Sequence, residues 1–488
     1  MSASLNPGQD AKFLIVSFDG LRSDIVNEER TPNLLRLAGA GVRFSNHRTV
    51  FPSESMVAYA SLVTGAPPAD HGIVANNFAD PGVMPGRRIN TGSVEDIDYA
   101  DRAYGGKLFT TPTLGDILRR ANRRLAVISG NSPGCTRLVD LSGVADGGFS
   151  FCYPHLNYSY PRQLAEEIAA SPGLPEAEAQ AGPSSRYLTD VFLRHVWPSQ
   201  RPDLTVLIFN EPDTSFHGCG LGSPESIAVI KDADTQLGRI LDFWQTEPGL
   251  QLIVMSDHGH IAQVKRVSVR DALEAADLPV SSHPTSSGAI GLLPGHVGKI
   301  YVPDRCAKTL DRIVEVLSAE PWCGMLIAKD ELSVPGAIRM SDAFVNHPRA
   351  PDLYYTLRGN DSDNRFGIRG VCFADDDAFF DGAGYHGGLH IDEMSCLAVA
   401  AGSLFKRGHQ SSIFSGITDI APTILSVFGV APPPSMKGRV LREAFADSHP
   451  SEHAIIFDEL SATRGKYRQT LRRVQVDGVH YLDHGLIE

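Results

Sequence analysis

The amino-acid sequence predicts an α/β fold in which helices cover both faces of a central, mostly parallel β-sheet. Short apolar runs rich in β-branched residues alternate with helical patterns, the order typical of such a sheet. The expected strands are residues 13–18, 125–129, 204–209, 252–256 and 396–401, and the helical patterns include 113–122 and 225–244. With 488 residues, 42% of them hydrophobic, the chain can bury a large core.

The regular pattern weakens between residues 261 and 380, where Pro, Gly, Asp and Ser are frequent. This segment is interpreted as an inserted cap or subdomain, and residues 1–260 and 381–488 as the catalytic core. Residues 79–112 are expected to form a long loop, and loops of that length in compact domains are often functional.

Three aspartates follow three of the expected strands. Asp19 comes directly after 13–18, Asp257 directly after 252–256, and Asp213 a few residues after 204–209. Ligands of parallel sheets bind beyond the carboxyl ends of the strands. The three carboxylates are therefore expected to lie together on one rim of the sheet.

Three histidines stand in short motifs beside these aspartates or in a glycine-rich loop: His217 in EPDTSFH, His258 in MSDHG and His386 in YHGG. Each motif alone is weak, because an aspartate after a strand is usually a turn or cap residue. Together they offer two sets of three nitrogen and oxygen ligands with open positions, which is typical of a catalytic pair of metal ions. Mixed histidine and carboxylate ligation favours zinc, with manganese or iron as alternatives. His71 is interpreted as part of the turn after the expected helix, and His260 as an ordinary loop residue. His390 is interpreted as a residue that contacts the metal ligands without binding metal itself.

A candidate nucleophile lies at the start of an expected helix. Pro52 and Ser53 can begin this helix, and Gly65 suits its end. Ser55 would then lie in the first turn, where the helix dipole and free N–H groups favour an alkoxide and a phosphate oxygen. Alternatively, Ser53 or Ser55 merely caps the helix.

These motifs resemble those of the alkaline phosphatase superfamily, and within it the type I phosphodiesterase/nucleotide pyrophosphatase branch, with phosphonoacetate hydrolase as a close relative. The matching stretches are VTG at 63–65, HGI at 71–73, EPD-x-x-x-H at 211–217, DHG at 257–259, HGG at 386–388, TDIAPTILSVFG at 418–429 and KGRVL at 437–441. The resemblance spans most of the chain and implies an alkaline-phosphatase-like fold.

The resemblance also implies roles for single residues. Asp213, His217 and His386 would hold one divalent ion, and Asp19, Asp257, His258 and the nucleophile Ser55 the other. Asn76 would bind the substrate phosphate. The branch has Thr-Phe-Pro at the nucleophile, whereas Phe51 and Pro52 precede Ser55 here. The assignment of Ser55 therefore rests on its spacing to VTG, and Ser53 is the alternative nucleophile.

The predicted function is a two-metal hydrolase that cleaves a phosphodiester or nucleotide pyrophosphate bond through a phosphoseryl intermediate. One alternative is hydrolysis of a carbon–phosphorus bond, as in phosphonoacetate hydrolase. Another is a catalytically inactive, metal-stabilised binding protein. The sequence defines neither the leaving group nor the oligomeric state, so a homo-oligomer is left open.

The motifs and the resemblance imply a small phosphorus-ester substrate, and composition argues against two other kinds of partner. The formal net charge of -13 argues against a broad basic face for duplex nucleic acid. No apolar run is long enough to span a bilayer, and residues 1–12 lack the apolar core of a secretory signal, so a cytoplasmic protein without a membrane partner is expected. The seven cysteines are dispersed and are expected to be free thiols.

Overall fold

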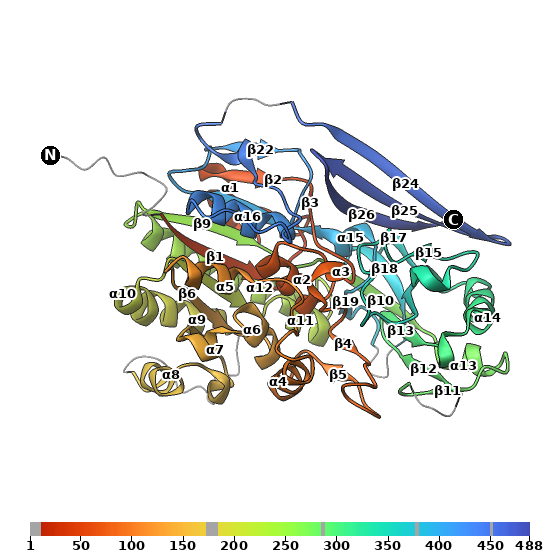
Figure 1. The fold of residues 1–488 in the computed structure, drawn as a ribbon. Helices are drawn as coiled ribbons and strands as arrows, with labels where there is room; N and C mark the ends of the chain where they lie inside the picture. Colours follow the sequence, from red (N-terminus) through yellow and green to blue (C-terminus); the bar gives the residue numbers. More distant parts are fainter. Residues whose placement is uncertain (1–10, 172–183, 285–287, 376–379, 449–451) are drawn as a thin grey trace.

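The computed structural model describes residues 11–171, 184–284, 288–375, 380–448 and 452–488. The polar N-terminal segment considered above lies, apart from its last two residues, outside the described residues. An eight-stranded sheet forms the centre of the molecule (Figure 1), in the order β22-β2-β21-β9-β1-β8-β6-β7. The strands are β22 (His409–Ser411), β2 (Val42–Phe44), β21 (Ala398–Ala401), β9 (Leu250–Met255), β1 (Lys12–Phe18), β8 (Leu204–Phe209), β6 (Leu125–Ser129) and β7 (Phe149–Cys152).

The predicted α/β fold is confirmed, with one difference in strand direction. Strands β9, β1, β8, β6 and β7 are parallel, as expected. The last expected strand is divided into β20 (Ser395–Cys396) and β21, and β21 runs antiparallel to β9. All four residues of β21 are buried. Its apolar sequence therefore predicts a buried strand but does not indicate whether that strand runs parallel or antiparallel to its neighbour.

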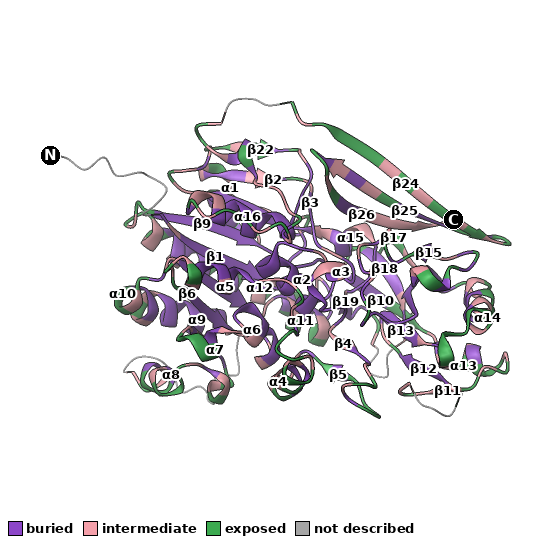
Figure 2. Ribbon diagram, viewed as in Figure 1, coloured by how far each residue is buried: buried purple, intermediate pink, exposed green. Residues whose placement is uncertain are grey.

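Two hydrophobic cores lie on opposite faces of this sheet, and the alternation of side chains along β1 separates them. Phe13 and Ile15 belong to one core, and Leu14 and Val16 belong to the other. The central strands between the two cores are buried, and the outer helices are partly exposed (Figure 2).

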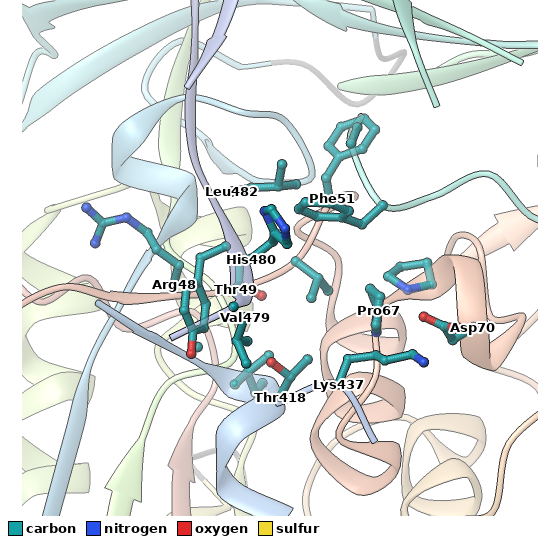
Figure 3. A pocket seen from close by; sticks show the side chains of 18 residues that line it. Arg48, Thr49, Phe51, Pro67, Asp70, Thr418, Lys437, Val479, His480 and Leu482 are labelled. Atoms are coloured by element: carbon teal, nitrogen blue, oxygen red, sulfur yellow. The ribbon is translucent and has the colours of Figure 1, made fainter. Parts of the chain in front are cut away.

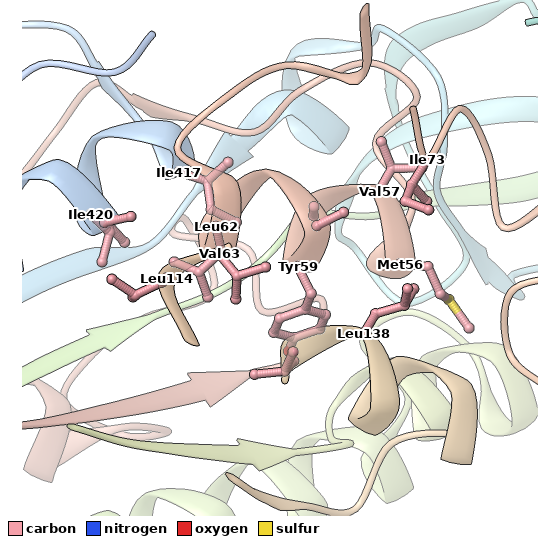
Figure 4. Close-up of a cluster of buried hydrophobic side chains, with 14 of the residues drawn as sticks. Met56, Val57, Tyr59, Leu62, Val63, Ile73, Leu114, Leu138, Ile417 and Ile420 are labelled. Carbon is pink, nitrogen blue, oxygen red and sulfur yellow. The ribbon is translucent and has the colours of Figure 1, made fainter. Parts of the chain in front are cut away.

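Helices supply the other half of each core. The first core contains α2 (Ser55–Thr64), α5 (Leu114–Arg120), α6 (Pro133–Val139) and α16 (Ile420–Val427), and the second contains α1 (Pro32–Ala40), α9 (Ser185–Val191) and α12 (Pro224–Trp244). Figure 4 shows side chains of α2, among them Val57 and Leu62, packed with Leu114 and Ile417. All ten residues of α2 are buried, so this helix is a central element.

The helix predictions hold for α5, which Thr113 caps, and for α12. The expected loop at 79–112 is wrong in part, because it contains β5 (Ile89–Asn90) and α4 (Val94–Ala103). Ser93 caps α4 by accepting the Asp96 N–H. Only two apolar side chains of this helix are buried, Ile97 and Ala100, and most of its residues are polar, so its apolar face is small.

Shorter elements connect these layers. They are β3 (His47–Arg48), β4 (Asn77–Phe78), β23 (Ser415–Gly416), α3 (Pro68–His71), α7 (Gly143–Asp146), α8 (Arg162–Ala169), α10 (Trp197–Gln200), α11 (Asp213–Cys219) and α15 (Ile391–Met394). Within the described ranges, no helix is long and apolar enough to cross a membrane.

The segment at 261–380 forms most of two further sheets. One has the order β11-β12-β13-β16-β14-β15, and the other β17-β18-β10-β19. Their strands are β10 (Ile261–Arg266), β11 (Val280–Ser281), β12 (Ile290–Leu293), β13 (Val297–Tyr301), β14 (Cys323–Ala328), β15 (Ile338–Arg339), β16 (Leu353–Leu357), β17 (Gly359–Asp363), β18 (Arg369–Ala374) and β19 (Gly384–Tyr385). Helices α13 (Val269–Glu274) and α14 (Ala307–Ser318) pack on a third hydrophobic cluster there.

A C-terminal antiparallel sheet of β24 (Ile455–Arg464), β25 (Tyr467–Val476) and β26 (Val479–Ile487) packs against this segment. Gln469 on β25 is buried, and its side chain bonds to Leu326 at both the N–H (3.0 Å) and the C=O (2.9 Å). The same amide also donates to the Gly336 carbonyl at 2.6 Å. One side chain thus satisfies three backbone groups of the neighbouring segment.

We expect Gln469→Ala to lower the free energy of unfolding by about 2–4 kcal/mol, because it leaves buried backbone groups of Leu326 and Gly336 unsatisfied. Urea unfolding followed by circular dichroism measures the change. Arg472→Ala, at an exposed position of the same strand, is the matched control and should cost less than about 0.5 kcal/mol. Equal effects of the two substitutions would contradict this role of Gln469.

Candidate functional site

The three aspartates lie together because they follow adjacent parallel strands. Asp19 follows β1, Asp257 follows β9 after one residue, and Asp213 begins α11 beyond β8. Backbone hydrogen bonds join the three loops: the Gly20 N–H donates to Asp257 Oδ1 at 3.0 Å, and the Asp213 N–H donates to the Asp19 carbonyl at 3.0 Å. The carboxyl end of the sheet therefore gathers all three carboxylates on one rim.

The three histidines point into the same region. His217 lies one turn after Asp213 on α11, and its Nε2 is 3.2 Å from Asp213 Oδ1. His386 Nε2 is 3.4 Å from the same oxygen. His258 Nε2 lies 3.5 Å from Asp19 Oδ1 and 3.4 Å from Asp257 Oδ2. The structure thus brings together all six residues that the sequence singles out as ligands.

His260 joins them, and here the expectation of an ordinary loop residue is wrong. Its side chain is fully buried, and its Nε2 is 3.1 Å from Asp213 Oδ1. Within the described ranges, Asp213, His217, His260 and His386 offer ligand atoms within 4.8 Å of one another, and Asp19, Asp213 and His258 form a second such group.

Ser55 is the first residue of α2, and its hydroxyl faces these side chains. Its Oγ is 3.1 Å from His258 Nε2. Ser53, the alternative nucleophile, is turned away: its Oγ donates to the Gly388 carbonyl at 2.8 Å and accepts the Gly387 N–H at 3.1 Å. Ser53 therefore anchors the loop that carries His386, and Ser55 is the serine whose hydroxyl faces the clustered side chains.

Asn76 lies beside Ser55 with its side-chain amide oriented. The Met56 N–H donates to Asn76 Oδ1 at 3.0 Å, so the side-chain NH₂ is the end that remains to donate to a ligand. The Asn76 backbone N–H donates to Glu54 Oε2, and Lys299 Nζ donates to Glu54 Oε1 at 2.8 Å. A buried ion pair thus joins the start of α2, the Asn76 loop and strand β13.

A hollow of about 430 Å³ opens over this site. Its lining is Ser55, Met56, Asn76, Gly130, Asn131, Ser132, Pro154, His155, Asn210, Asp213, His217 and His386. Among these lining residues there is no arginine or lysine. A separate, mainly apolar cavity of about 250 Å³ lies between the C-terminal sheet and the core (Figure 3), and none of the candidate ligands lines it.

Burial of several carboxylates in one place shifts their pKa values. Burial raises the pKa of Asp19 well above its ordinary value, and the charges of Asp257 and Asp213 act in the same direction. Burial also raises the pKa of Asp257 to about 6, although the Gly20 N–H opposes this shift. Asp213 differs: burial would raise its pKa, but His217 and the other imidazoles hold it well below the usual range.

The donor set fits divalent cations. Asp19 Oδ1, Asp213 Oδ1, Asp257 Oδ2 and His260 Nε2 are buried and make no hydrogen bond within the described parts of the chain. Buried polar atoms in proteins are normally satisfied, and buried like charges are stabilised by opposite charge. Cations placed among these atoms would supply both the missing partners of the polar atoms and the opposite charge.

Besides His260, sequence reasoning missed three residues that support the site. Asn131 donates a hydrogen bond to Asp19 Oδ2, and it comes two residues after the end of β6, so its position beyond a strand is a signal in the sequence. Glu54 and Lys299 are far apart in the chain, and only the fold brings them together.

Fold and site define the class: the protein is an alkaline-phosphatase-like α/β protein with a serine facing clustered aspartates and histidines. Within that class, the chain belongs to the type I phosphodiesterase / nucleotide pyrophosphatase family, whose sequence profile matches residues 13–360.

Relatives with curated descriptions are similar over about half of the chain. A venom phosphodiesterase of Macrovipera lebetinus is 24% identical over 258 residues, which is 51% of this chain and 26% of the venom protein. The human ectonucleotide pyrophosphatase/phosphodiesterase family member 5 is 26% identical over 265 residues, or 52% of this chain and 46% of the human protein. The matches thus span about half of these relatives or less.

Solved structures share the fold more completely. Murine ectonucleotide pyrophosphatase/phosphodiesterase 5 has a TM-score of 0.60 and 20% identity, and the match covers 87% of this chain and 96% of the murine chain. The human protein of the same name has a TM-score of 0.61 and 18% identity, covering 89% and 100%. These matches agree with the alkaline-phosphatase-like fold.

We expect Lys299→Met to lower the free energy of unfolding by about 3–5 kcal/mol, because it leaves the buried Glu54 carboxylate without its partner. Chemical denaturation measures the loss. The double variant Glu54→Gln/Lys299→Met removes both charges and should recover more than half of it. Lys308→Met, at an exposed position of the same segment, should change stability by less than about 0.5 kcal/mol. A loss no larger than that of the control would rule out a structural role for the ion pair.

Proposed function

We propose that the protein is a hydrolase that requires two divalent ions and cleaves a phosphodiester or nucleotide pyrophosphate bond, with Ser55 as nucleophile. One observation carries the proposal: Ser55 lines a hollow, and its hydroxyl is 3.1 Å from His258 among clustered aspartates and histidines. A binding protein without catalysis would need no hydroxyl at that position.

Asp213, His217 and His386 would hold one ion, and Asp19, Asp257, His258 and Ser55 the other. When bound, the ions would lower the pKa of the Ser55 hydroxyl and neutralise charge on the phosphate group. Zinc suits this mixture of imidazoles and carboxylates, and manganese is the alternative.

The residues of the chain then perform two displacements. Ser55 Oγ attacks phosphorus and gives up its hydroxyl proton, while the bond from phosphorus to the leaving oxygen breaks and the departing alkoxide or phosphate takes up a proton. Water then attacks the same phosphorus: its oxygen and one proton remain on the released phosphate ester, and its other proton restores the Ser55 hydroxyl. Charge that develops on the phosphate oxygens would be met by the Asn76 side-chain NH₂ and by the Ser55 backbone N–H.

A diester fits this hollow better than a monoester. A phosphomonoester carries a second negative charge that arginine or lysine commonly binds, and neither residue type is among those that line the hollow. Asn76 is neutral and leaves the remaining phosphate substituent free to be an ester. The murine relative described above was solved as an inactive variant in complex with AMP, which favours a nucleotide substrate here as well.

We expect the protein to release nitrophenol from a nitrophenyl phosphodiester, and to lose this activity after dialysis against a chelator. Added Zn²⁺ or Mn²⁺ should restore it. Ser55→Ala should lower kcat by at least about 1,000-fold, because the remaining groups cannot replace the nucleophile. Steady-state rates measure both effects, and mass spectrometry after an acid quench should find a phosphoryl adduct on the peptide that contains Ser55.

Three further measurements test the choice of nucleophile and of function. Ser53→Ala should retain the adduct on Ser55, and loss of the adduct with Ser53→Ala but not with Ser55→Ala would reverse the assignment. Phosphate release from phosphonoacetate that exceeds diester turnover would favour the carbon–phosphorus hydrolase. A protein that binds its full complement of metal but turns over no phosphorus ester, and whose properties do not change with Ser55→Ala, would be a metal-stabilised binding protein.

A further inference from the structure

His260 lies among the proposed ligands, although the ligand set inferred from the motifs does not include it. Its imidazole centroid is 5.4 Å from that of His217 and 5.0 Å from that of His386, and those two are 5.3 Å apart. The three rings therefore surround a common point near Asp213, whose Oδ1 lies 3.1–3.4 Å from each Nε2.

The hydrogen bonds of His260 determine which nitrogen faces that point. His260 Nδ1 is 3.0 Å from the carbonyl oxygen of Gly20, which can only accept, so Nδ1 carries the proton. In the neutral imidazole, Nε2 then presents a lone pair to the carboxylate oxygen of Asp213. Two lone pairs face each other at 3.1 Å, an arrangement that a cation between them stabilises.

Two of the proposed ligands have the same arrangement. His386 Nδ1 is 2.9 Å from the Ser53 carbonyl, and His258 Nδ1 is 3.0 Å from the Gly259 carbonyl. Metal-binding histidines typically donate the other ring N–H to such a partner, which fixes the tautomer and the ring orientation. His260 has this feature of a ligand in full.

The backbone also makes room for the His260 ring at two glycines. A Cβ at Gly20 would lie 2.2 Å from His260 Cε1, and a Cβ at Gly384 would lie 3.2 Å from His260 Cδ2. Gly20 has a φ of +71°, which favours glycine for a second reason. The loop after β1 and strand β19 therefore both accommodate an imidazole at this place.

We propose that His260 is a fourth protein ligand of the ion held by Asp213, His217 and His386, an inference that rests on the proposed two-metal function. This ion is then bound by three imidazoles and one carboxylate, whereas the other is bound by two carboxylates, one imidazole and the Ser55 hydroxyl. Nitrogen-rich sites favour zinc-like ions over magnesium or calcium. The Asp213 site is therefore the more selective of the two.

The competing role for His260 is structural, as a donor that holds the Gly20 loop, and two substitutions separate the roles. His260→Asn can retain the donor to the Gly20 carbonyl but has no atom at the Nε2 position. His260→Gln places an amide oxygen or nitrogen near the Nε2 position and loses the Nδ1 donor. A ligand role predicts ion affinity in the order wild type, His260→Gln, His260→Asn. A purely structural role predicts that His260→Asn equals wild type and that His260→Gln is impaired.

Competition of the full-length protein with a chromogenic chelator for Zn²⁺ measures the affinities, and the visible absorption of the Co²⁺-loaded protein reports the coordination of the ion. We expect His260→Asn to weaken one of two bound ions by at least about 10- to 100-fold, to leave the other unchanged, and to alter the Co²⁺ spectrum. His71→Asn is the matched control, a buried histidine that bonds Ser61 away from the site, and it should bind both ions as wild type does.

The possible results have distinct meanings. Two ions bound by wild type and by His260→Asn with equal affinity and equal Co²⁺ spectra would overturn the role of His260 and leave the proposed function intact. Absence of bound ions in active wild-type protein would overturn both. Thermal unfolding of the metal-free proteins identifies a variant that fails to fold. If His260→Asn fails to fold, an unchanged Co²⁺ spectrum in His260→Gln overturns the inference. A changed spectrum supports it when metal-free His260→Gln unfolds at the wild-type temperature, and a changed spectrum together with a lowered unfolding temperature assigns the structural role instead.

Discussion

The gathering of three carboxylates at the end of a parallel sheet is the constraint on which the rest of the site depends. Asp19, Asp213 and Asp257 follow neighbouring strands, so the strand order places like charges together. Asp19 and Asp257 are fully buried, and Asp213 is partly buried with its Oδ1 inaccessible to solvent. Such an arrangement is stable only with opposite charge and hydrogen bonds around it. The Gly20 N–H and the Asn131 amide satisfy some of the oxygens, and others are left facing the imidazoles.

The position of Ser55 depends on a second constraint, which couples the core to the segment at 261–380. Ser55 begins a fully buried helix, and the residue before it, Glu54, is paired with Lys299 on β13. The same carboxylate accepts the backbone N–H of Asn76. The hydroxyl and the amide that would contact one phosphate are therefore fixed by a strand of another sheet. The segment at 261–380 contributes to the geometry of the site even though Lys299 does not line the hollow.

The sequence predicts those parts of the structure that depend on local pattern. Apolar runs identify the central strands, and the position after a strand identifies the three aspartates, because a parallel sheet converts that position into proximity. The sequence does not predict helix α4, because little of it is buried. It does not predict the direction of β21, because a strand buried on both faces carries no signal of its direction. The roles of Lys299 and His260 are not predicted for another reason. Their roles come from contacts with Glu54 and Gly20, which lie more than 200 positions away in the chain.

Charge balance connects these features to the choice of substrate. Three carboxylates and two divalent ions would leave a net charge of about +1, or about zero when the Ser55 hydroxyl is ionised. A phosphodiester carries one negative charge, which such a centre neutralises with little excess of either sign. A monoester would bring a second charge into a hollow whose lining contains no arginine or lysine. Because the imidazoles, His260 among them, are neutral donors, a fourth ligand at the Asp213 ion would strengthen its binding without lowering the positive charge that attracts the phosphate. Under the proposed function, nitrogen ligation would thus let the protein hold an ion tightly and still keep the charge that a monoanionic ester requires.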